Sequence, residues 1–269
     1  PFVLAAPGAV YNQNDVSYWS GYFDGSSYLN TPDNAAYALN SGGWTFETFA
    51  NFTALPGSGN AASLAAQWYD GNLGWWFYLY NNAGTYQLYF SYSSTGTNQI
   101  NISVSLPAAP TLNTWNHVAF QYIAGFGLGI YWNGTIIGSY QSVSSSFNNS
   151  TAAVQIGARL GSGGAGYYMN GYLSNMRLVN AGGGSFIWPE TSPLTAVSGT
   201  TLLTLQSAAF ADNSTTNAVF TPVGTPTVTG NNPFQAGYYS NYFDGSGDWL
   251  SLADSSAWDL SGDFTVEAW

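Results

Sequence analysis

A stretch near the start of the chain is repeated near its end. Residues 22–29 read YFDGSSYL, and residues 242–250 read YFDGSGDWL. The likeness continues to Glu47 and Glu267, which lie 220 positions apart. Repetition at a fixed period defines the unit that folds. Because Pro-Phe also precedes both copies, we predict one complete repeat of roughly 232 residues and the start of the next, within a longer tandem protein.

This repeat sets the predicted boundaries. We expect a linker at 1–18, a folded domain at 19–216, a second linker at 217–238 and a truncated second repeat at 239–269. Within the second linker, alternation around Pro222 indicates only a short edge ribbon, because Pro is excluded from central strands. The folded part has the length of a large all-β domain, and 45% hydrophobic residues provide for its core.

Alternating segments predict the strands of that domain. Residues 44–52 alternate large apolar with small polar side chains, as half-buried strands do. Asn133-Gly134 between two apolar runs is the strongest short signal for a β-hairpin. Helical periodicity is missing over any three turns, so the pattern predicts an all-β sandwich or barrel. Further strands are expected near residues 62–68, 75–80, 86–92, 99–105, 115–123, 127–132, 135–141, 152–157 and 169–179.

Charge is scarce in this chain. Arg159 and Arg177 are the only Lys or Arg residues, against 13 acidic ones, and the net charge is −11. Two cations cannot neutralise a phosphate backbone or hold an anionic membrane, so nucleic acids and membranes are excluded as partners. No run of about 18 apolar residues predicts membrane insertion. The absence of Cys excludes disulfides and thiolate chemistry.

Three blocks in sequence order carry a family resemblance. Residues 115–119 (WNHVA), 130–134 (IYWNG) and 171–178 (GYLSNMRL) resemble the conserved blocks of laminin-G-like modules, in the concanavalin A-like lectin/glucanase superfamily. The YFDGSGDWLSL stretch at 242–252 resembles tandem versions of these modules in bacteriophage and bacterial surface proteins. One departure is the uncharged GFGLG at 125–129, where the family usually carries charge on the outer face of the strand.

The resemblance covers about residues 19–216 and implies a definite architecture. The expected fold is an antiparallel two-sheet jelly-roll sandwich of the concanavalin A-like type, with one curved face. The family is mostly non-catalytic, and its members often bind glycans or Ca²⁺. We therefore weighed glycan, calcium and catalytic sites against structural roles for the same residues.

Catalysis finds little support in the residues. Glycosidases need two carboxylates about 5–9 Å apart, and the related glucanases carry them as E-x-D-x-x-E. Glu47, Glu190 and Glu267 are the only glutamates, and none lies in such a pattern. His117 is the only His, and we expect it to be a packed residue bonded to a backbone carbonyl. The sequence therefore predicts a protein that is not an enzyme.

A calcium site is the one cofactor that the sequence leaves open. Ca²⁺ takes six to eight oxygens from carboxylates, carbonyls and amides. Asp24, Asp212 and Asn213 come from opposite ends of the domain, and a jelly roll can bring them together. The alternative is that Asp24 closes a tight turn before Gly25. A D-x-D-x-D-G loop is absent from the sequence.

Glycan binding requires exposed aromatic platforms beside amide and hydroxyl groups. The alternative is that the aromatic side chains fill the sandwich core. Side chains of neighbouring residues in a strand point to opposite faces, so one of Trp75 and Trp76 should lie outside the core. Two loops supply the candidate residues, which are Tyr69, Asp70, Asn72, Trp75, Trp76, Tyr167 and Tyr168.

Two functions remain. The first is a non-catalytic structural module of a tandem-repeat virion or cell-surface protein, which packs against copies of itself or neighbouring repeats and presents loops outward. Its support is the repeat, together with a surface whose low charge favours assembly. The second is a carbohydrate-binding adhesin module, Ca²⁺-dependent if the Asp24 site exists, that attaches to host polysaccharide. Both predict an extracellular location.

Overall fold

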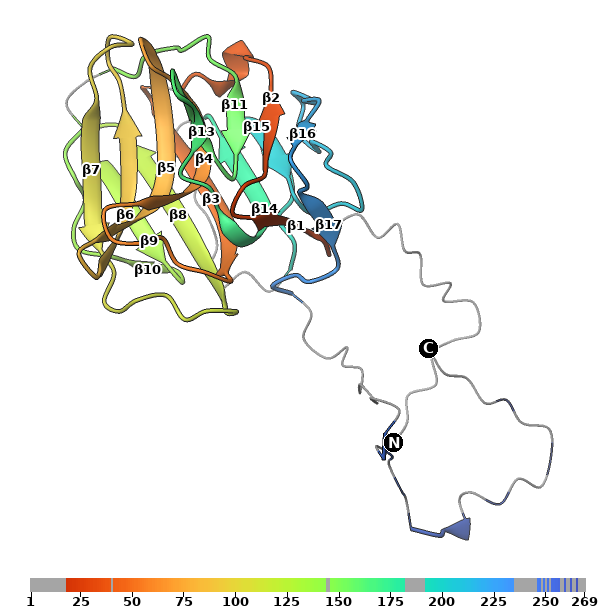
Figure 1. Ribbon diagram of the computed structural model, residues 1–269. Helices are drawn as coiled ribbons and strands as arrows, with labels where there is room; N and C mark the ends of the chain where they lie inside the picture. Colours follow the sequence, from red (N-terminus) through yellow and green to blue (C-terminus); the bar gives the residue numbers. More distant parts are fainter. Residues whose placement is uncertain are drawn as a thin grey trace. The chain divides into compact units, whose positions relative to one another are not determined.

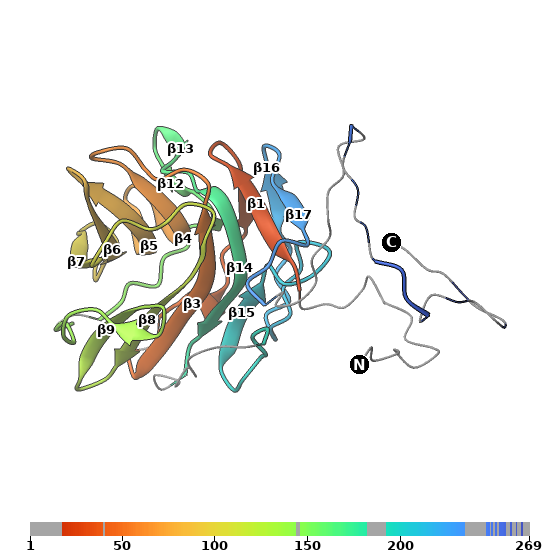
Figure 2. The ribbon, with the colours of Figure 1, turned by 90° about the horizontal axis from the view of Figure 1, so that it is seen from below.

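Alternation of apolar and polar residues produces two stacked antiparallel sheets, which Figures 1 and 2 show from the front and from below. The computed structural model describes residues 18–39, 41–143, 146–181 and 192–234, with scattered positions between 246 and 265. The chain divides into two units, residues 1–235 and 236–269. All named strands lie in the first unit. Almost the whole predicted linker at 1–18, and most of the second copy, lie outside the described residues.

Sheet A is the larger layer. Its order is β10 (Thr135–Ile136), β9 (Gly127–Trp132), β8 (Trp115–Ile123), β3 (Gly43–Phe52), β14 (Asn170–Val179), β1 (Ser20–Asp24) and β17 (Thr227–Thr229). An eighth strand, β15 (Thr200–Thr204), pairs with β14. The expected Asn-Gly hairpin is confirmed, because Asn133 and Gly134 have φ of 48° and 73° and join β9 to β10. The strand predicted at 135–141 is nonetheless reduced to two residues.

Sheet B forms the other layer, and its outer face is turned toward the viewer in Figure 1. Its order is β16 (Thr221–Val223), β2 (Tyr28–Thr31), β11 (Val154–Ile156), β4 (Ala61–Tyr69), β5 (Asn72–Asn82), β6 (Thr85–Tyr92) and β7 (Ile100–Ser105). A separate two-stranded hairpin of β12 (Arg159–Gly161) and β13 (Gly164–Gly166) contacts β4. A 3-10 turn, η1 (Ala35–Tyr37), begins at Asn34, whose side chain accepts from the Ala36 amide.

The YFDG motif lies at the crossing between the layers. β1 pairs with β14 in sheet A, whereas β2 pairs with β11 in sheet B, so the turn after Asp24 carries the chain from one sheet to the other. Residues 217–238, which we predicted to be a linker, contain two strands, β16 and β17. These are edge strands of the two sheets and do not pair with each other as a ribbon. Pro222 is compatible with that position, since an edge strand tolerates a missing donor.

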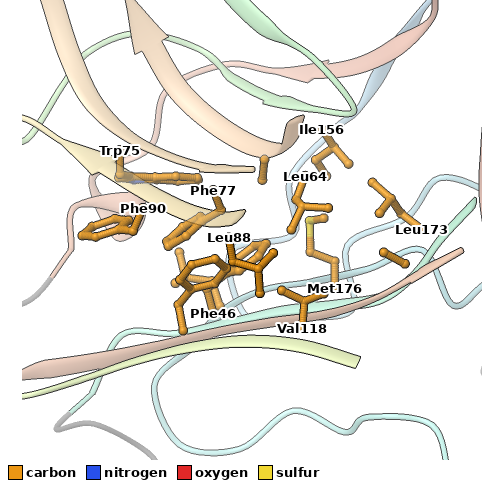
Figure 3. Close-up of a cluster of buried hydrophobic side chains, with 14 of the residues drawn as sticks. Phe46, Leu64, Trp75, Phe77, Leu88, Phe90, Val118, Ile156, Leu173 and Met176 are labelled. Carbon is orange, nitrogen blue, oxygen red and sulfur yellow. The ribbon is translucent and has the colours of Figure 1, made fainter. Parts of the chain in front are cut away.

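The core fills the space between the sheets. Phe46 of sheet A stacks on Phe77 of sheet B at 4.2 Å between ring centroids and 4° between planes. Figure 3 shows these rings beside Trp75, Leu88 and Phe90, all buried. Burying an aromatic side chain removes about 150–250 Å² from water, so a core of this composition supplies most of the folding free energy. Within the described residues, no helix has the length and apolar character needed to cross a membrane.

One glycine fixes the register of the central pair of strands. Gly171 has φ of +137°, and a Cβ there would lie 2.1 Å from the backbone oxygen of Asn51 on β3. A side chain at this position would separate β14 from β3, where Gly171 is opposite Phe52. The close approach of β3 therefore explains why glycine occupies the first position of the GYLSNMRL block.

Candidate functional site

The outer face of sheet B carries the aromatic residues that the core does not use. Trp76, Tyr78 and Tyr80 point outward from β5, while the alternate positions pack between the sheets. The prediction that one residue of the Trp75-Trp76 pair lies outside the core is confirmed. Trp75 as a glycan ligand is wrong, because it is 1% exposed and its Nε1 donates to the Tyr37 carbonyl at 2.9 Å.

These outward rings form a continuous stack. Trp76 and Tyr78 stack at 3.6 Å between centroids, and Tyr78 stacks on Tyr89 of β6 at 5.0 Å. Tyr80 meets Tyr89 edge-on at 5.4 Å. Trp76 and Tyr78 are only 3% and 4% exposed, whereas Tyr80 and Tyr89 are half-buried. Burial raises the pKa of Tyr78, so its phenol stays neutral and serves as a hydrogen-bonding group.

Neutral polar groups flank the rings on β6 and β7. Ser91 Oγ and Gln99 Nε2 both donate to Asn101 Oδ1, at 2.7 and 2.8 Å. Gln87 Nε2 donates to Ser105 Oγ at 3.1 Å. Strands β5, β6 and β7 contain no charged residue. This part of the face is therefore aromatic in the middle and lined with amides and hydroxyls at its margin.

The β12–β13 hairpin covers the other part of the face. Figure 1 shows it beside β4, and Asp70 of the β4–β5 turn holds it there. Asp70 Oδ2 accepts from the Ser162 amide at 2.9 Å and from Ser162 Oγ at 2.8 Å. These two hydrogen bonds lower the pKa of Asp70, and the charge of Arg159 lowers it further. Asp70 therefore has a structural role in fixing the hairpin.

Under the hairpin, Arg159 lies among three rings. Its Cζ is 4.7 Å from the ring centroids of both Trp76 and Tyr167, and 5.9 Å from that of Trp68. Tyr167 is 37% exposed and has φ of +56°, a backbone region that few non-glycine residues adopt. The Ser63 amide donates to the Tyr167 carbonyl at 2.8 Å and so fixes this conformation.

A groove borders this cluster. It has a volume of about 210 Å³ and lies where the β3–β4 loop meets the loop before β14. Ala61, which lines the groove, is paired with Tyr80 in the β4–β5 ladder, so this end of the groove adjoins the aromatic face. It is lined by Gly25, Ala54, Leu55, Pro56, Asn60, Ala61, Ala62, Tyr167, Tyr168 and Asn170.

The structure brings only some of the predicted glycan residues together. Tyr167 and Tyr168 line the groove, and the Tyr168 hydroxyl donates to the Ala165 carbonyl at 3.1 Å. Tyr69 is 46% exposed at the end of β4. Asn72 is engaged by Thr151, since its Nδ2 donates to Thr151 Oγ1 at 2.8 Å. Trp76 lies beneath Tyr167 as a support and is itself almost fully covered.

The predicted metal residues are occupied by hydrogen bonds of their own turns. Asp24 Oδ1 accepts from the amide and the hydroxyl of Ser26, both at 2.9 Å. These hydrogen bonds, led by the backbone amide, lower the pKa of Asp24 to about 2. Thr225 Oγ1 donates to the other carboxylate oxygen of Asp24. The arrangement is the turn closure weighed as the alternative to a calcium site.

Asp212 has a similar but separate environment. Its carboxylate accepts from the amides of Leu203, Ser214 and Ala218 at 2.9–3.0 Å. Asn213 Nδ2 donates to Ser207 Oγ at 3.0 Å. In the described part of the chain, no three His, Cys, Asp or Glu side chains form a group that could hold a metal ion.

The outer face of sheet A contains a buried ionic cluster. Glu47 accepts from Arg177 Nε at 2.9 Å and Nη2 at 2.5 Å, and His117 Nε2 lies 3.1 Å from its other oxygen. His117 therefore has a carboxylate partner, Glu47, which the sequence did not lead us to expect. Burial opposes ionisation of Glu47, but His117 and Arg177 outweigh it and keep the pKa of Glu47 lowered. With both oxygens engaged and the side chain 0% exposed, Glu47 is structural.

The comparison with family models decides the family. The model of the concanavalin A-like lectin/glucanases superfamily, of the third laminin G type, matches residues 23–181, which is more than half of the chain. The chain belongs to the concanavalin A-like lectin/glucanases superfamily. This match confirms the laminin-G-like resemblance, and the two antiparallel sheets of this concanavalin A-like chain confirm the predicted jelly-roll sandwich. No curated protein sequence matches it.

Solved structures share the same fold at low sequence identity. A heptameric SAP-like pentraxin from Limulus polyphemus has a TM-score of 0.51 and 18% identity, over 80% of this chain and 95% of the pentraxin. A candidate carbohydrate-binding protein from Bacteroides ovatus has a TM-score of 0.50 and 16% identity, over 79% of this chain. The concanavalin A-like chain spans only 60% of that second protein.

Sequence reasoning missed the open part of the aromatic face. Tyr80, Tyr89, Gln87 and Asn101 were not among the candidates, although the signal was present. The β5 sequence NLGWWFYLYNN places large aromatic side chains at both alternating sets of positions. When one of the two alternating sets of side chains in a strand faces solvent, the residues of that set are normally polar. Aromatic residues in both sets therefore indicate either a covered sheet or a binding face.

Proposed function

We propose that this protein is a non-catalytic carbohydrate-binding module whose site is the outer face of sheet B. One observation supports the proposal most. The partly exposed rings of Tyr80, Tyr89 and Tyr167 rest on the buried rings of Trp76 and Tyr78, beside a groove and neutral polar side chains.

The chemistry of a sugar matches this face. A pyranose ring has an apolar C–H surface, which packs on an aromatic ring, and hydroxyls at its edge that both donate and accept. Amide side chains such as Gln87, Gln99 and Asn101 offer both kinds of partner. Rings already held by stacking lose little conformational freedom when a ligand binds, which favours affinity.

The same residues argue for binding without hydrolysis. Glycoside hydrolysis requires two carboxylates about 5–9 Å apart around the scissile bond. Asp70 is near the face, but Ser162 engages it, and Glu47 is buried on the opposite sheet. Since β5, β6 and β7 are uncharged, no second carboxylate is available on these strands.

The comparisons lend support of a general kind. The Bacteroides ovatus protein that shares this fold is described as carbohydrate-binding, and the family name includes lectins. A glycan-binding module of this kind fits an extracellular location on a cell or virion surface, attached to host polysaccharide. The Ca²⁺ dependence suggested by Asp24 and Asp212 is tested in the same experiment as binding itself.

The experiment is a glycan array with the 269-residue protein, run with Ca²⁺ and again with chelator, followed by calorimetric titration of the best ligand. Truncating a central aromatic anchor costs about 2 kcal/mol, or roughly thirtyfold in Kd. We expect losses of this size for Tyr80→Ala and Tyr89→Ala, and no loss for Phe126→Ala, an exposed aromatic residue in the β8–β9 turn. Unchanged affinity in Tyr80→Ala and Tyr89→Ala, as in the Phe126→Ala control, would refute the site. The absence of any binding by the folded protein would refute the function.

A second role follows from the internal repeat. We propose that the module also packs against neighbouring repeats or copies of itself, because residues 22–29 recur at 242–250. Only 6% of the residues are charged, and depletion of charged residues is typical of the core of protein–protein interfaces. Sedimentation velocity should show association that increases with protein concentration. A single monomeric species at the highest concentration reached would contradict this role.

A further inference from the structure

The cation in the aromatic cluster is unusual for this chain. Arg159 is one of only two basic residues, and the other, Arg177, is paired with Glu47. Among the described residues, Arg159 makes no ion pair and donates no hydrogen bond, and its Nε is buried without a partner. Asp70, whose carboxylate feels the charge of Arg159, accepts its hydrogen bonds from Ser162.

A guanidinium group packed against rings still has unused donors. The Arg159 Cζ lies over the rings of Trp76 and Tyr167, whose quadrupoles attract the cation without occupying its N–H donors. Its five N–H donors lie in the plane and point outward as a fork that matches a carboxylate. The residue as a whole is half-buried, and because Nε is buried, the solvent-exposed part lies elsewhere on the side chain. The aromatic cage therefore holds the cation in place without neutralising it.

The cage is continuous with the proposed binding site. Tyr167 contacts Arg159 on one side and lines the groove on the other. Tyr167 has a left-handed backbone, and such strain persists only where the surroundings enforce it. A sugar in the groove would have its substituents within reach of Arg159, whereas one on the β5–β7 strands would meet only neutral groups.

We propose that Arg159 selects glycans that carry an anionic group, a uronate carboxylate or a sulfate, seated beside Tyr167 at the hairpin end of the groove. This inference depends on the proposed function, since it names the class of glycan that the site takes. Of the 13 acidic residues, six follow residue 235 and are not part of the unit that contains Arg159.

The test compares matched acidic and neutral ligands with the whole protein. The pairs are oligogalacturonate with its methyl ester, hyaluronan oligomers with their carboxyl-reduced form, and dextran sulfate with dextran. We expect the acidic member of at least one pair to bind at least tenfold more tightly, by an amount that falls between 50 and 500 mM NaCl because salt screens exposed charges. A carboxylate preference and a sulfate preference both support the proposal and are told apart by the pair that shows it.

Two variants separate selection from mere structural support. Arg159→Gln should lose the acidic preference, roughly ten- to hundredfold for a charged hydrogen bond, yet keep the affinity for the neutral member. Asp70→Asn should raise the ratio of acidic to neutral affinity, because it removes a negative charge that competes for the guanidinium. Equal affinity for both members of every pair, or a preference that Arg159→Gln retains, would overturn the inference and leave the proposed function intact. Failure of all six ligands and of the array would overturn both.

Discussion

The buried carboxylate Glu47 gives a sharp prediction of stability. Glu47→Gln keeps the size of the side chain but leaves Arg177, whose side chain is 7% exposed, without its counter-charge. Removing one partner of a buried ion pair costs about 3–5 kcal/mol. For a domain of this size each kcal/mol lowers Tm by about 2–4 °C, so the variant should melt roughly 6–20 °C below the wild type at pH 7.

The pH dependence of this loss tests its cause. The folded-state pKa of Glu47 lies below its ordinary value of 4.5, so its contribution is complete above that pH and is lost as the pH falls through the folded pKa. The difference in Tm between variant and wild type should therefore narrow below about pH 4.5. Calorimetry on both sides of this pH measures it, with Val219→Ala, at a side chain that is 76% exposed and does not titrate, as a control expected within about 2 °C of wild type. A Glu47→Gln protein as stable as wild type at pH 7, or a difference that does not narrow in acid, would refute the reasoning.

Three further predictions concern the turns and the register. The carboxyl group of Asp24 should titrate at about pH 2 in a carbon-13 NMR titration, because hydrogen bonds from Ser26 stabilise its charged form, and a midpoint near 4 would contradict those bonds. Since Asp24 and Asp212 are occupied by their own turns, Ca²⁺ or chelator should leave Tm unchanged, and a rise with Ca²⁺ would restore the metal hypothesis. Gly171→Ala should destabilise the fold by more than 1 kcal/mol in urea denaturation, since its Cβ would overlap the Asn51 carbonyl, and an unchanged midpoint would show that the strands can separate there.

The strands were largely predictable from the sequence because the core follows a period of two. Residues 115–123 and 127–132 were predicted with the bounds that β8 and β9 have. The sheet assignment was harder, because alternation does not say which layer a strand joins. The turn at Asp24 sends β1 and β2 to different sheets, and β16 and β17 complete the sheet edges from a segment read as a linker.

The site was less predictable for a physical reason. Whether an outward aromatic side chain is exposed depends on what covers it. Here the cover is the β12–β13 hairpin, which the glycine-rich sequence of residues 159–166 did not predict. Alternation predicted that one of Trp75 and Trp76 lies outside the core without saying which, and the outer one, Trp76, is covered by Arg159 and Tyr167. The Arg159 cage joins residues more than 80 positions apart, so it exists only in the folded chain.

The most direct test of glycan binding on sheet B is a crystal structure of the protein with its best-binding oligosaccharide. We expect sugar rings packed against Tyr80, Tyr89 or Tyr167, with amide side chains of sheet B on the hydroxyls and any anionic group beside Arg159. Sugar bound instead on sheet A, or at the Asp24 turn through a metal ion, would contradict it.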